Sequence, residues 1–236
     1  MRLAVVALCL FAGAAGAAER RMLGPGEAEA FQAVGRLNVA GSRFCSATLI
    51  SAREVLTAAH CLYNPRTGRA VPLSEIRFVP GHRIEANAGV RRVTKAVTAP
   101  GFVLLDNPRP DELGVDIALL ELDEAVARVE PFAVEALAAA AALSIVSYAR
   151  DRGEAPSITE ACPRLGLLGE VMIVACAIEQ GMSGAPVFVG VGAGRRLVAV
   201  VSAMRLRNDG VVFGLTVLAA PWIGTLRTAL AAAPAE

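Results

Sequence analysis

Short β-rich runs alternate with turn residues along most of this sequence, and this alternation limits the fold more than any other feature. Gly, Pro, Asn and Asp separate the runs, as in Tyr63-Asn64-Pro65 and Asn208-Asp209-Gly210. Helix signals are few, and many short strands without intervening helices favour antiparallel barrels. The predicted strands are Val34–Val39, Phe44–Ile50, Glu54–Thr57, Ile76–Val79, Val90–Val97, Ile117–Leu122, Leu143–Tyr148, Gly169–Ala175, Ala185–Val189, Leu197–Ala203 and Val211–Val217.

Two segments depart from the strand pattern. Asp123 to Ala142 is alanine-rich toward its end, and Ala136 to Ala142 is typical of a short helix or a loop. We expect the linker between two barrels there. The tail from Pro221 to Leu230 has helical spacing, which predicts a C-terminal helix. We expect Trp222 and Ile223 to dock that helix on the second barrel.

The N-terminus has the composition of a secretory signal. Met1-Arg2 is followed by an apolar run from Leu3 to Ala12 and by small residues from Gly13 to Ala18. The apolar run is short for a membrane span, so we predict cleavage after Ala17 and a secreted or periplasmic protein that does not interact with membranes after signal removal. The formal net charge of +1 gives little basis for binding nucleic acid.

Cysteine usage agrees with export. Removal of the signal takes away Cys9 and leaves four cysteines: Cys45, Cys61, Cys162 and Cys176. An even number in an exported chain favours two disulfides, and four cysteines allow three pairings. A zinc site is disfavoured because the chain has only two histidines and no Cys-x-x-Cys spacing. We predict no metal and no cofactor.

Three segments contain the residue types of activated-serine chemistry. His60 lies in Leu56-Thr57-Ala58-Ala59-His60-Cys61, Ser183 lies between glycines in Gln180-Gly181-Met182-Ser183-Gly184, and Asp116 leads into an apolar strand. A nucleophile, a base and an acid that orients the base are the parts required. The alternatives are a core histidine at His60 and a glycine turn at Ser183. Asp106 and Asp111 are rivals to Asp116, but they lie in a proline-rich loop where turn capping explains them.

In this order and these contexts, the three segments resemble the chymotrypsin/trypsin-like serine peptidases of bacterial type, in the glutamyl-endopeptidase-like branch. The resemblance spans about Phe31 to Leu230 and implies two antiparallel six-stranded β-barrels with a short C-terminal helix. It implies a triad of His60, Asp116 and Ser183, and an oxyanion hole formed by the Gly181 and Ser183 amides. Pairing neighbouring cysteines joins Cys45 to Cys61, which the resemblance also implies, and Cys162 to Cys176.

The expected organisation follows from these assignments. The predicted parts are a signal peptide at 1–17, an N-terminal segment at 18–30, a first barrel at 31–125, a linker at 126–142, and a second barrel with the C-terminal helix at 143–236.

The sequence also departs from the trypsin-like pattern. Met182 precedes Ser183, where that pattern has an aspartate that pairs with a newly cut N-terminus, and no Ile-Val-Gly-Gly start occurs near residue 30. We therefore expect activity directly after signal removal. By the family's spacing, the substrate pocket is formed by Ala177, Ile178, Val201, Ser202, Ala203 and Met204. These residues predict a preference for small or medium apolar side chains rather than Arg, Lys or Glu.

The predicted function is that of a secreted serine endopeptidase that acts on polypeptides as a monomer. Three alternatives are compared with it. A catalytically silent binding protein on the same scaffold is the main one, although all three triad residues are present. A quality-control peptidase is disfavoured because the chain has no room for an added peptide-binding module. Gly-x-Ser-x-Ala also resembles the nucleophile elbow of α/β-hydrolases, but in that fold the histidine comes last in the chain, and here it comes first.

Overall fold

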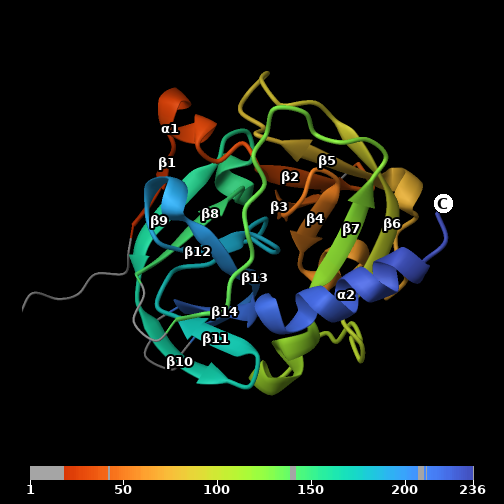
Figure 1. The fold of residues 1–236 in the computed structure, drawn as a ribbon. Helices are drawn as coiled ribbons and strands as arrows, with labels where there is room; N and C mark the ends of the chain where they lie inside the picture. Colours follow the sequence, from red (N-terminus) through yellow and green to blue (C-terminus); the bar gives the residue numbers. More distant parts are fainter. Residues whose placement is uncertain (1–18, 42, 139–141, 207–209, 211, 236) are drawn as a thin grey trace, which may run out of the picture.

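The computed structural model describes residues 19–41, 43–138, 142–206, 210 and 212–235, and these form two antiparallel β-sheets packed side by side (Figure 1). The strands are β1 (Arg20–Met22), β2 (Val34–Val39), β3 (Arg43–Leu49), β4 (Glu54–Thr57), β5 (Ile76–Pro80), β6 (Arg91–Thr98), β7 (Ala118–Leu122), β8 (Leu143–Ser147), β9 (Ser157–Cys162), β10 (Arg164–Leu168), β11 (Val171–Val174), β12 (Pro186–Val189), β13 (Arg196–Leu206) and β14 (Val212–Leu218). The helices are α1 (Pro25–Glu29) and α2 (Ala220–Ala232). The all-β class with a C-terminal helix is therefore confirmed.

The first sheet is a closed barrel of β2 to β7 in the order β2-β3-β4-β7-β6-β5. Its interior is filled by inward-facing apolar side chains such as Leu37, Leu49 and Leu120, each fully buried. Gly35 on β2 is necessary for this closure, because a Cβ there would lie 2.5 Å from the ring of Phe78 on the neighbouring β5. Apolar side chains that point inward thus favour the barrel, and Gly35 allows β2 and β5 to approach closely enough for the barrel to close.

The second sheet contains eight strands in the order β1-β9-β8-β12-β13-β14-β11-β10, where six were expected. Two features account for the difference. The N-terminal β1 adds to the edge of β9, with Arg20 opposite Thr159. In addition, β9 and β10 are one run of chain interrupted only at Pro163. In the sheet order, β9 lies next to one end, beside β1, and β10 lies at the other end, so this bent run curls the sheet round. Proline lacks the N–H that a continuous strand donates, which explains the interruption.

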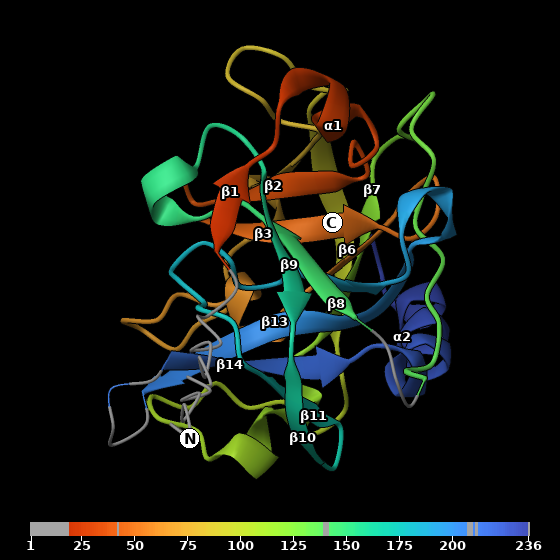
Figure 2. The same ribbon diagram turned by 90° about the vertical axis from the view of Figure 1, so that its left-hand side faces the viewer.

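The sequence pattern missed β1, β9 and β10. Arg20-Arg21-Met22 has no apolar alternation, and three leucines of β10, Leu165, Leu167 and Leu168, are exposed. Figure 2 shows the face on which β1 and β9 lie. β1 and β10 form by pairing with a neighbour rather than by burying a face of their own, whereas β9 is mostly buried.

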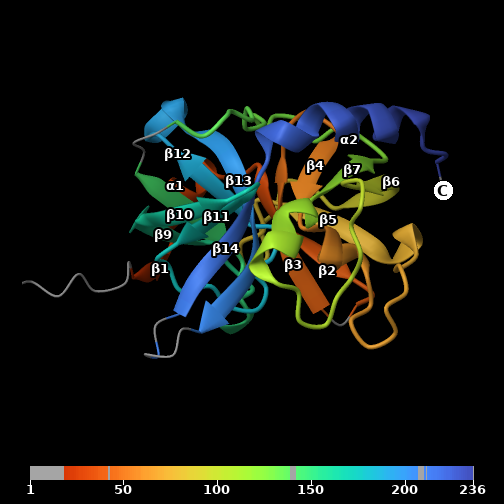
Figure 3. The same ribbon diagram turned by 90° about the horizontal axis from the view of Figure 1, so that it is seen from below.

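A shared apolar cluster joins the two sheets. It includes Leu119 on β7 and Val200 on β13, together with Leu226 on α2. Helix α2 lies along the first barrel and contacts β6 and β7 (Figure 3). The expectation that Trp222 and Ile223 dock α2 on the second barrel was therefore incomplete, because the cluster they pack against contains residues of both sheets.

Two disulfides brace the sheets, and they join Cys45 to Cys61 and Cys162 to Cys176, as expected from pairing of neighbouring cysteines. The alanine-rich stretch 136–142 lies partly outside the described residues. Among the described helices, none has the length and apolar character needed to span a membrane.

Candidate active site

His60 is held at a rigid point of the first barrel. Strand β4 ends at Thr57, and a 3₁₀ turn over Ala59–Leu62 follows at once. Ala58 and Ala59, which precede His60, are fully buried, and Cys61, which follows it, forms a disulfide with Cys45 on β3. The backbone on both sides of His60 is therefore fixed, while its side chain remains 27% exposed.

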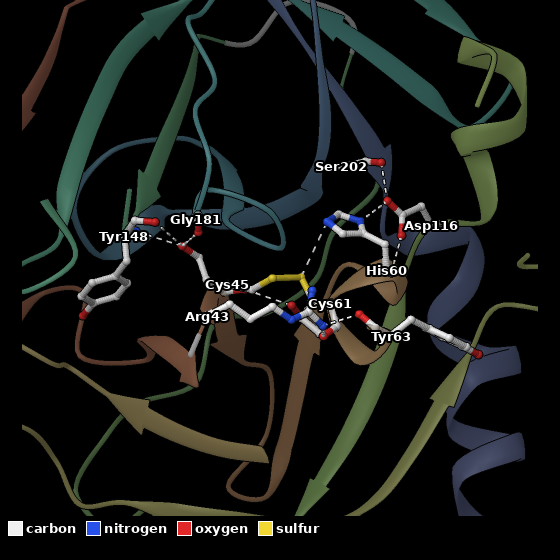
Figure 4. The surroundings of a disulfide bond; sticks show 11 residues. Arg43, Cys45, His60, Cys61, Tyr63, Asp116, Tyr148, Gly181 and Ser202 are labelled. Atoms are coloured by element: carbon white, nitrogen blue, oxygen red, sulfur yellow. Dashed lines mark hydrogen bonds and ion pairs between the residues drawn. A yellow bond between two sulfur atoms is a disulfide. The ribbon is translucent and has the colours of Figure 1, made fainter. Parts of the chain in front are cut away.

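Asp116 lies where a 3₁₀ turn over Pro110–Val115 meets β7, and its side chain is only 2% exposed. Its Oδ1 accepts a hydrogen bond from the backbone N–H of His60 at 2.8 Å, and its Oδ2 accepts one from His60 Nδ1 at 2.7 Å. The hydroxyl of Ser202 on β13 donates to the same Oδ2 at 2.5 Å. Figure 4 shows His60, Asp116 and Ser202 converging in this way. A buried carboxylate needs such partners, and this one has three.

The two groups shift one another's ionisation. Burial disfavours the charged form of each, but the opposite charge and the hydrogen bonds outweigh it. Burial alone would lower the pKa of His60, but the charge and hydrogen bond of the Asp116 carboxylate outweigh this effect and raise the pKa. The pKa of Asp116 is lowered, against the effect of burial, by the charge and hydrogen bonds of His60 and by the Ser202 hydroxyl. Asp116 is thus ionised at neutral pH.

An ionised Asp116 fixes the tautomer of His60. A carboxylate can only accept hydrogen bonds, so Nδ1 of the neutral imidazole must carry the hydrogen. The lone pair of Nε2 is then free to accept a proton. Nε2 lies 3.9 Å from Cys61 Sγ, and no oxygen of the described residues hydrogen-bonds to it. Cys45, His60 and Cys61 have ligand-type atoms within 4.8 Å of one another, but the two sulfurs form a disulfide and are not thiolates.

The loop with Ser183 packs directly on the segment that leads to His60. The carbonyl oxygen of Ser183 accepts a hydrogen bond from the Ser46 amide at 2.8 Å. Gly184 has a φ of +76°, and a Cβ there would lie 2.1 Å from Thr57 Oγ1 and 2.3 Å from the Ser46 carbonyl oxygen. Only glycine allows this approach. The half-buried Ser183 is therefore held beside β3 and beside Thr57, the last residue of β4. Thr57 lies three residues before His60 in the chain.

The amides of Gly181 and Ser183 have no acceptor among the described residues. The peptide between Gln180 and Gly181 has a defined direction, because the Arg150 amide donates to the Gln180 carbonyl oxygen at 2.7 Å. In a trans peptide the C=O and the N–H point to opposite sides. The Gly181 N–H therefore points away from Arg150. The φ of Gly181 is +92°, which an L side chain rarely adopts.

The residues expected to form the substrate pocket have different surroundings. Val201 is fully buried on β13, and Ile178 is buried against Gly214, where a Cβ would lie 2.6 Å from Ile178 Cγ1. Ala177 is exposed, and Met204 is 50% exposed beside an open pocket of about 390 Å³ that Gln180 and Glu179 also line. The hydroxyl of Ser202 points to Asp116 and not to a substrate pocket.

Another pocket, of about 240 Å³, borders His60. The loop residues Phe102, Val103, Leu104 and Leu105 line it together with Asp116 and Ser202. Asp106 lies at this pocket too, but it is exposed, and Asp111 is exposed and pairs with Arg109 at 3.6 Å. Neither rival carboxylate hydrogen-bonds to His60. Because Val103 is 67% exposed and Leu105 is 43% exposed, this pocket presents an apolar rim.

The second histidine lies elsewhere. His82 was expected at the surface, but its side chain is only 14% exposed, and its Nε2 is 3.1 Å from Glu154 Oε2. Two contributions to the site were missed from the sequence. One is the Ser202 hydroxyl as a partner of Asp116, and the other is Arg20, whose side chain contacts Met182 next to Ser183. Both depend on contacts between distant segments, which a local pattern does not reveal.

Comparisons with known proteins bear on this site. The family model described as Trypsin matches residues 25–223. A solved structure titled as a Glu endopeptidase in complex with MPD is 17% identical, with a TM-score of 0.73, over 92% of this chain and 98% of the other. A thermostable serine protease AL20 from an extremophilic microorganism is 18% identical, with a TM-score of 0.66, over 86% of this chain and 99% of the other. No curated protein sequence matches the chain significantly. The structural likenesses show a shared fold.

Proposed function

Because the chain belongs to the trypsin family and is a serine-type endopeptidase, we propose that Ser183, His60 and Asp116 are its catalytic triad and that it acts through an acyl-enzyme. The buried Asp116 carboxylate is the observation that supports this most strongly. Its Oδ2 accepts a hydrogen bond from His60 Nδ1 at 2.7 Å, so Nε2 is the ring nitrogen available as a base. Such an arrangement serves to orient the imidazole and to stabilise the imidazolium formed during reaction.

The proposed reaction proceeds in two steps, acylation and deacylation. The Ser183 oxygen attacks the carbonyl carbon of the substrate while His60 Nε2 takes the hydroxyl proton. The tetrahedral intermediate collapses, the C–N bond breaks, and His60 gives the proton to the leaving amine. Water then attacks the acyl-enzyme while His60 takes its proton. The ester C–O bond to Ser183 breaks, His60 returns the proton to the Ser183 oxygen, and the new carboxyl end is released.

The amides of Gly181 and Ser183 are the proposed oxyanion donors. Support comes from the Gln180 carbonyl, which is held toward Arg150 and leaves the Gly181 N–H free. Because these donors are fixed before substrate binds, they need no reorganisation as charge develops. Loss of one such donor costs about 2.7–4 kcal/mol of transition-state stabilisation. Ser183 and His60 form no hydrogen bond among the described residues, and in enzymes of this type such bonds often tighten only with substrate bound.

We also propose an apolar substrate preference. Ala177, Ile178, Val201 and Met204 have no charged group with which to pair Arg, Lys or Glu side chains. Apolar pockets discriminate weakly, by about 1–3 kcal/mol per methylene. We also propose that the protein is exported and that residues 1–17 are its signal. Two disulfides support an oxidising compartment.

A fluorophosphonate probe tests the proposal. The folded protein is expected to react covalently at Ser183, and Ser183→Ala is expected to abolish labelling with an unchanged melting temperature. His60→Ala should slow labelling strongly, since the hydroxyl then lacks a base. Folded wild-type protein that never reacts with the probe and never cleaves a peptide library would contradict the proposal and favour the silent binding scaffold. A library profile dominated by Arg, Lys or Glu would refute the apolar preference alone.

A further inference from the structure

The N-terminal strand β1 brings a cation into the neighbourhood of the proposed nucleophile. β1 pairs with β9, and the carbonyl oxygen of Arg20 accepts a hydrogen bond from Arg152 Nη1 at 3.0 Å. The side chain of Arg20 is turned inward and is only 11% exposed. The next residue, Arg21, is turned the other way, is 47% exposed, and pairs with Glu27 and Glu160.

The guanidinium of Arg20 contacts two different loops at once. Its Nη2 lies 2.7 Å and 2.8 Å from the two carboxylate oxygens of Asp151, and 3.2 Å from Glu179 Oε1. Its Nη1 donates to Met182 Sδ at 3.4 Å. Asp151 belongs to the loop after β8, whereas Glu179 and Met182 belong to the loop before β12. One partly buried cation thus connects two segments about thirty residues apart.

These two loops are the ones that set the direction of the proposed oxyanion donor. The neighbour of Asp151 is Arg150, whose amide holds the Gln180 carbonyl oxygen at 2.7 Å. On the other side, the Met182 amide bonds to the Glu179 carbonyl oxygen at 3.1 Å, and the Glu179 amide donates to Met182 Sδ at 3.3 Å. Gly181 lies between these contacts. A small separation of the loops would release the Gln180 carbonyl and allow the peptide to rotate.

Electrostatics explains why a cation is needed there. Asp151 and Glu179 both approach the same nitrogen of Arg20, so their carboxylates face one another across it. Arg152 Nε also lies 3.5 Å from Asp151 Oδ2, but among the described residues no ion pair joins it to Glu179. Without the Arg20 guanidinium, the two carboxylates would therefore repel, to an extent that water reduces because they are 45% and 48% exposed, and would favour separation of the loops. Met182, which is fully buried, has no charge of its own with which to hold the loop.

We propose that Arg20 is a positioning residue that holds the loops 148–153 and 179–183 together and thereby keeps the Gly181 amide directed at the developing oxyanion. The inference rests on the proposed function of Ser183 and Gly181. It gives the N-terminal segment a role in catalysis through an internal side chain. Arg20 lies after the proposed signal cleavage at Ala17, so the mature chain retains it.

The test compares Arg20→Ala, Arg20→Lys and the matched control Arg21→Ala. Arg20→Ala is expected to lower kcat at least about tenfold, and at most about 10³-fold, which is the cost of losing an oxyanion donor. KM should stay nearly constant, because the ground-state carbonyl uses this donor less than the tetrahedral intermediate does. Arg20→Lys keeps the charge but cannot bind both loops with a planar fork, so an intermediate kcat is expected. Arg21→Ala should match the wild type.

Two further readouts separate positioning from general destabilisation. Guanidinium ion added at low millimolar concentration should restore part of the kcat of Arg20→Ala, because it can occupy the vacated space between Asp151 and Glu179. A peptide boronate, which forms a tetrahedral adduct, should lose affinity for Arg20→Ala, whereas a cleaved product peptide should bind as before. If Arg20→Ala does not fold, kcat and boronate affinity are compared in Arg20→Lys and in Glu179→Gln, which removes the charge of one carboxylate that Arg20 contacts.

Two outcomes would overturn the inference. One is an Arg20→Ala enzyme with wild-type kcat and boronate affinity. The other is an equal loss in Arg20→Ala and Arg21→Ala that follows their melting temperatures and does not respond to guanidinium. A wild-type protein that is inert toward fluorophosphonate and peptides would instead refute the proposed function itself, so the two failures are distinguishable.

Discussion

The backbone amide of Arg150 donates a 2.7 Å hydrogen bond to the carbonyl oxygen of Gln180, and this bond determines which way the next peptide N–H points. The Gly181 amide is turned from Arg150 as a consequence. Two features reinforce this direction. A Cβ at residue 181 would lie 2.9 Å from the Tyr148 carbonyl oxygen and 2.7 Å from the Phe44 ring, so the segment has little room to move.

Gly181→Ala is expected to disturb this peptide and to lower kcat about 10²–10³-fold, as when an oxyanion donor is lost. The new methyl group meets the Phe44 ring and the Tyr148 carbonyl, and the φ of +92° disfavours any side chain. Steady-state kinetics with a peptide ester measures the change. Gly169→Ala is the matched control, because its φ is +57° and nothing lies within 4 Å of its Cβ position. The control should lose stability by about 1–2 kcal/mol, with kcat unchanged.

The pH dependence of kcat/KM is expected to report His60. Only the neutral imidazole acts as a base, so activity rises with pH through the pKa of this residue. Since the Asp116 carboxylate raises the pKa of His60 against the effect of burial, the midpoint should lie above the ordinary value of about 6.5. Asp116→Asn removes the charge, so the midpoint should fall below the wild-type value. In the template enzyme of this class, that change also lowers kcat about 10⁴-fold.

The same pKa shift has a consequence for stability. Because the pKa of His60 is raised on folding, the protonated imidazolium stabilises the native state fully below about pH 6.5, and this contribution is lost as pH rises through the folded pKa. This stabilisation of the native state is therefore present at pH values at which His60 is protonated and cannot act as a base. Denaturant unfolding of wild type and His60→Ala between pH 5 and pH 9 measures it, and a stability difference that grows with rising pH would contradict the assignment.

Ser202→Ala tests the hydroxyl that completes the partners of Asp116. The carboxylate keeps both hydrogen bonds from His60, so the imidazole stays in place, and kcat/KM should fall by roughly tenfold or less. The pKa of Asp116 should rise, because the Ser202 hydrogen bond is one of the contacts that lower it. Unfolding measured at acidic pH detects this rise. A loss as large as that of Asp116→Asn would show that Ser202 does more than hold the carboxylate.

Local patterns in the sequence were sufficient for most strands, and they are the basis on which the triad residues are proposed. Glu54–Thr57 and Val34–Val39 occur in the structure with the predicted bounds, because β-rich residues bounded by turn residues specify them locally. β1 and β10 were missed because neither buries a face of its own and each forms by pairing with a neighbour.

The site shows the same limit. The sequence identifies Met182 as a departure from the trypsin-like pattern, yet it gives no sign of Arg20, which lies 162 positions away and reaches Met182 only through β1. Ser202 was assigned to a pocket wall from family spacing. Its position on β13 is local, but the direction of its hydroxyl depends on Asp116, 86 residues earlier in the chain. Contacts of this kind arise from tertiary packing and leave no periodic trace.

The two disulfides provide a matched pair of stability tests. Cys45 and Cys61 are 16 residues apart, and Cys162 and Cys176 are 14 apart, so the chain-entropy model assigns about 3 kcal/mol to each bridge. Paired Cys→Ala variants of either bridge should therefore lower the free energy of unfolding to a similar extent, as measured by urea unfolding.

Their effects on catalysis should differ, because only one bridge adjoins the proposed base. Removal of Cys45–Cys61 frees the backbone next to His60 and should lower kcat. Removal of Cys162–Cys176 frees the segment before Ala177 and should raise KM or alter the cleavage preference, with kcat largely retained. Kinetics at a temperature well below both melting transitions separates these effects from unfolding. Equal losses of kcat in both variants under those conditions would show that neither bridge acts locally.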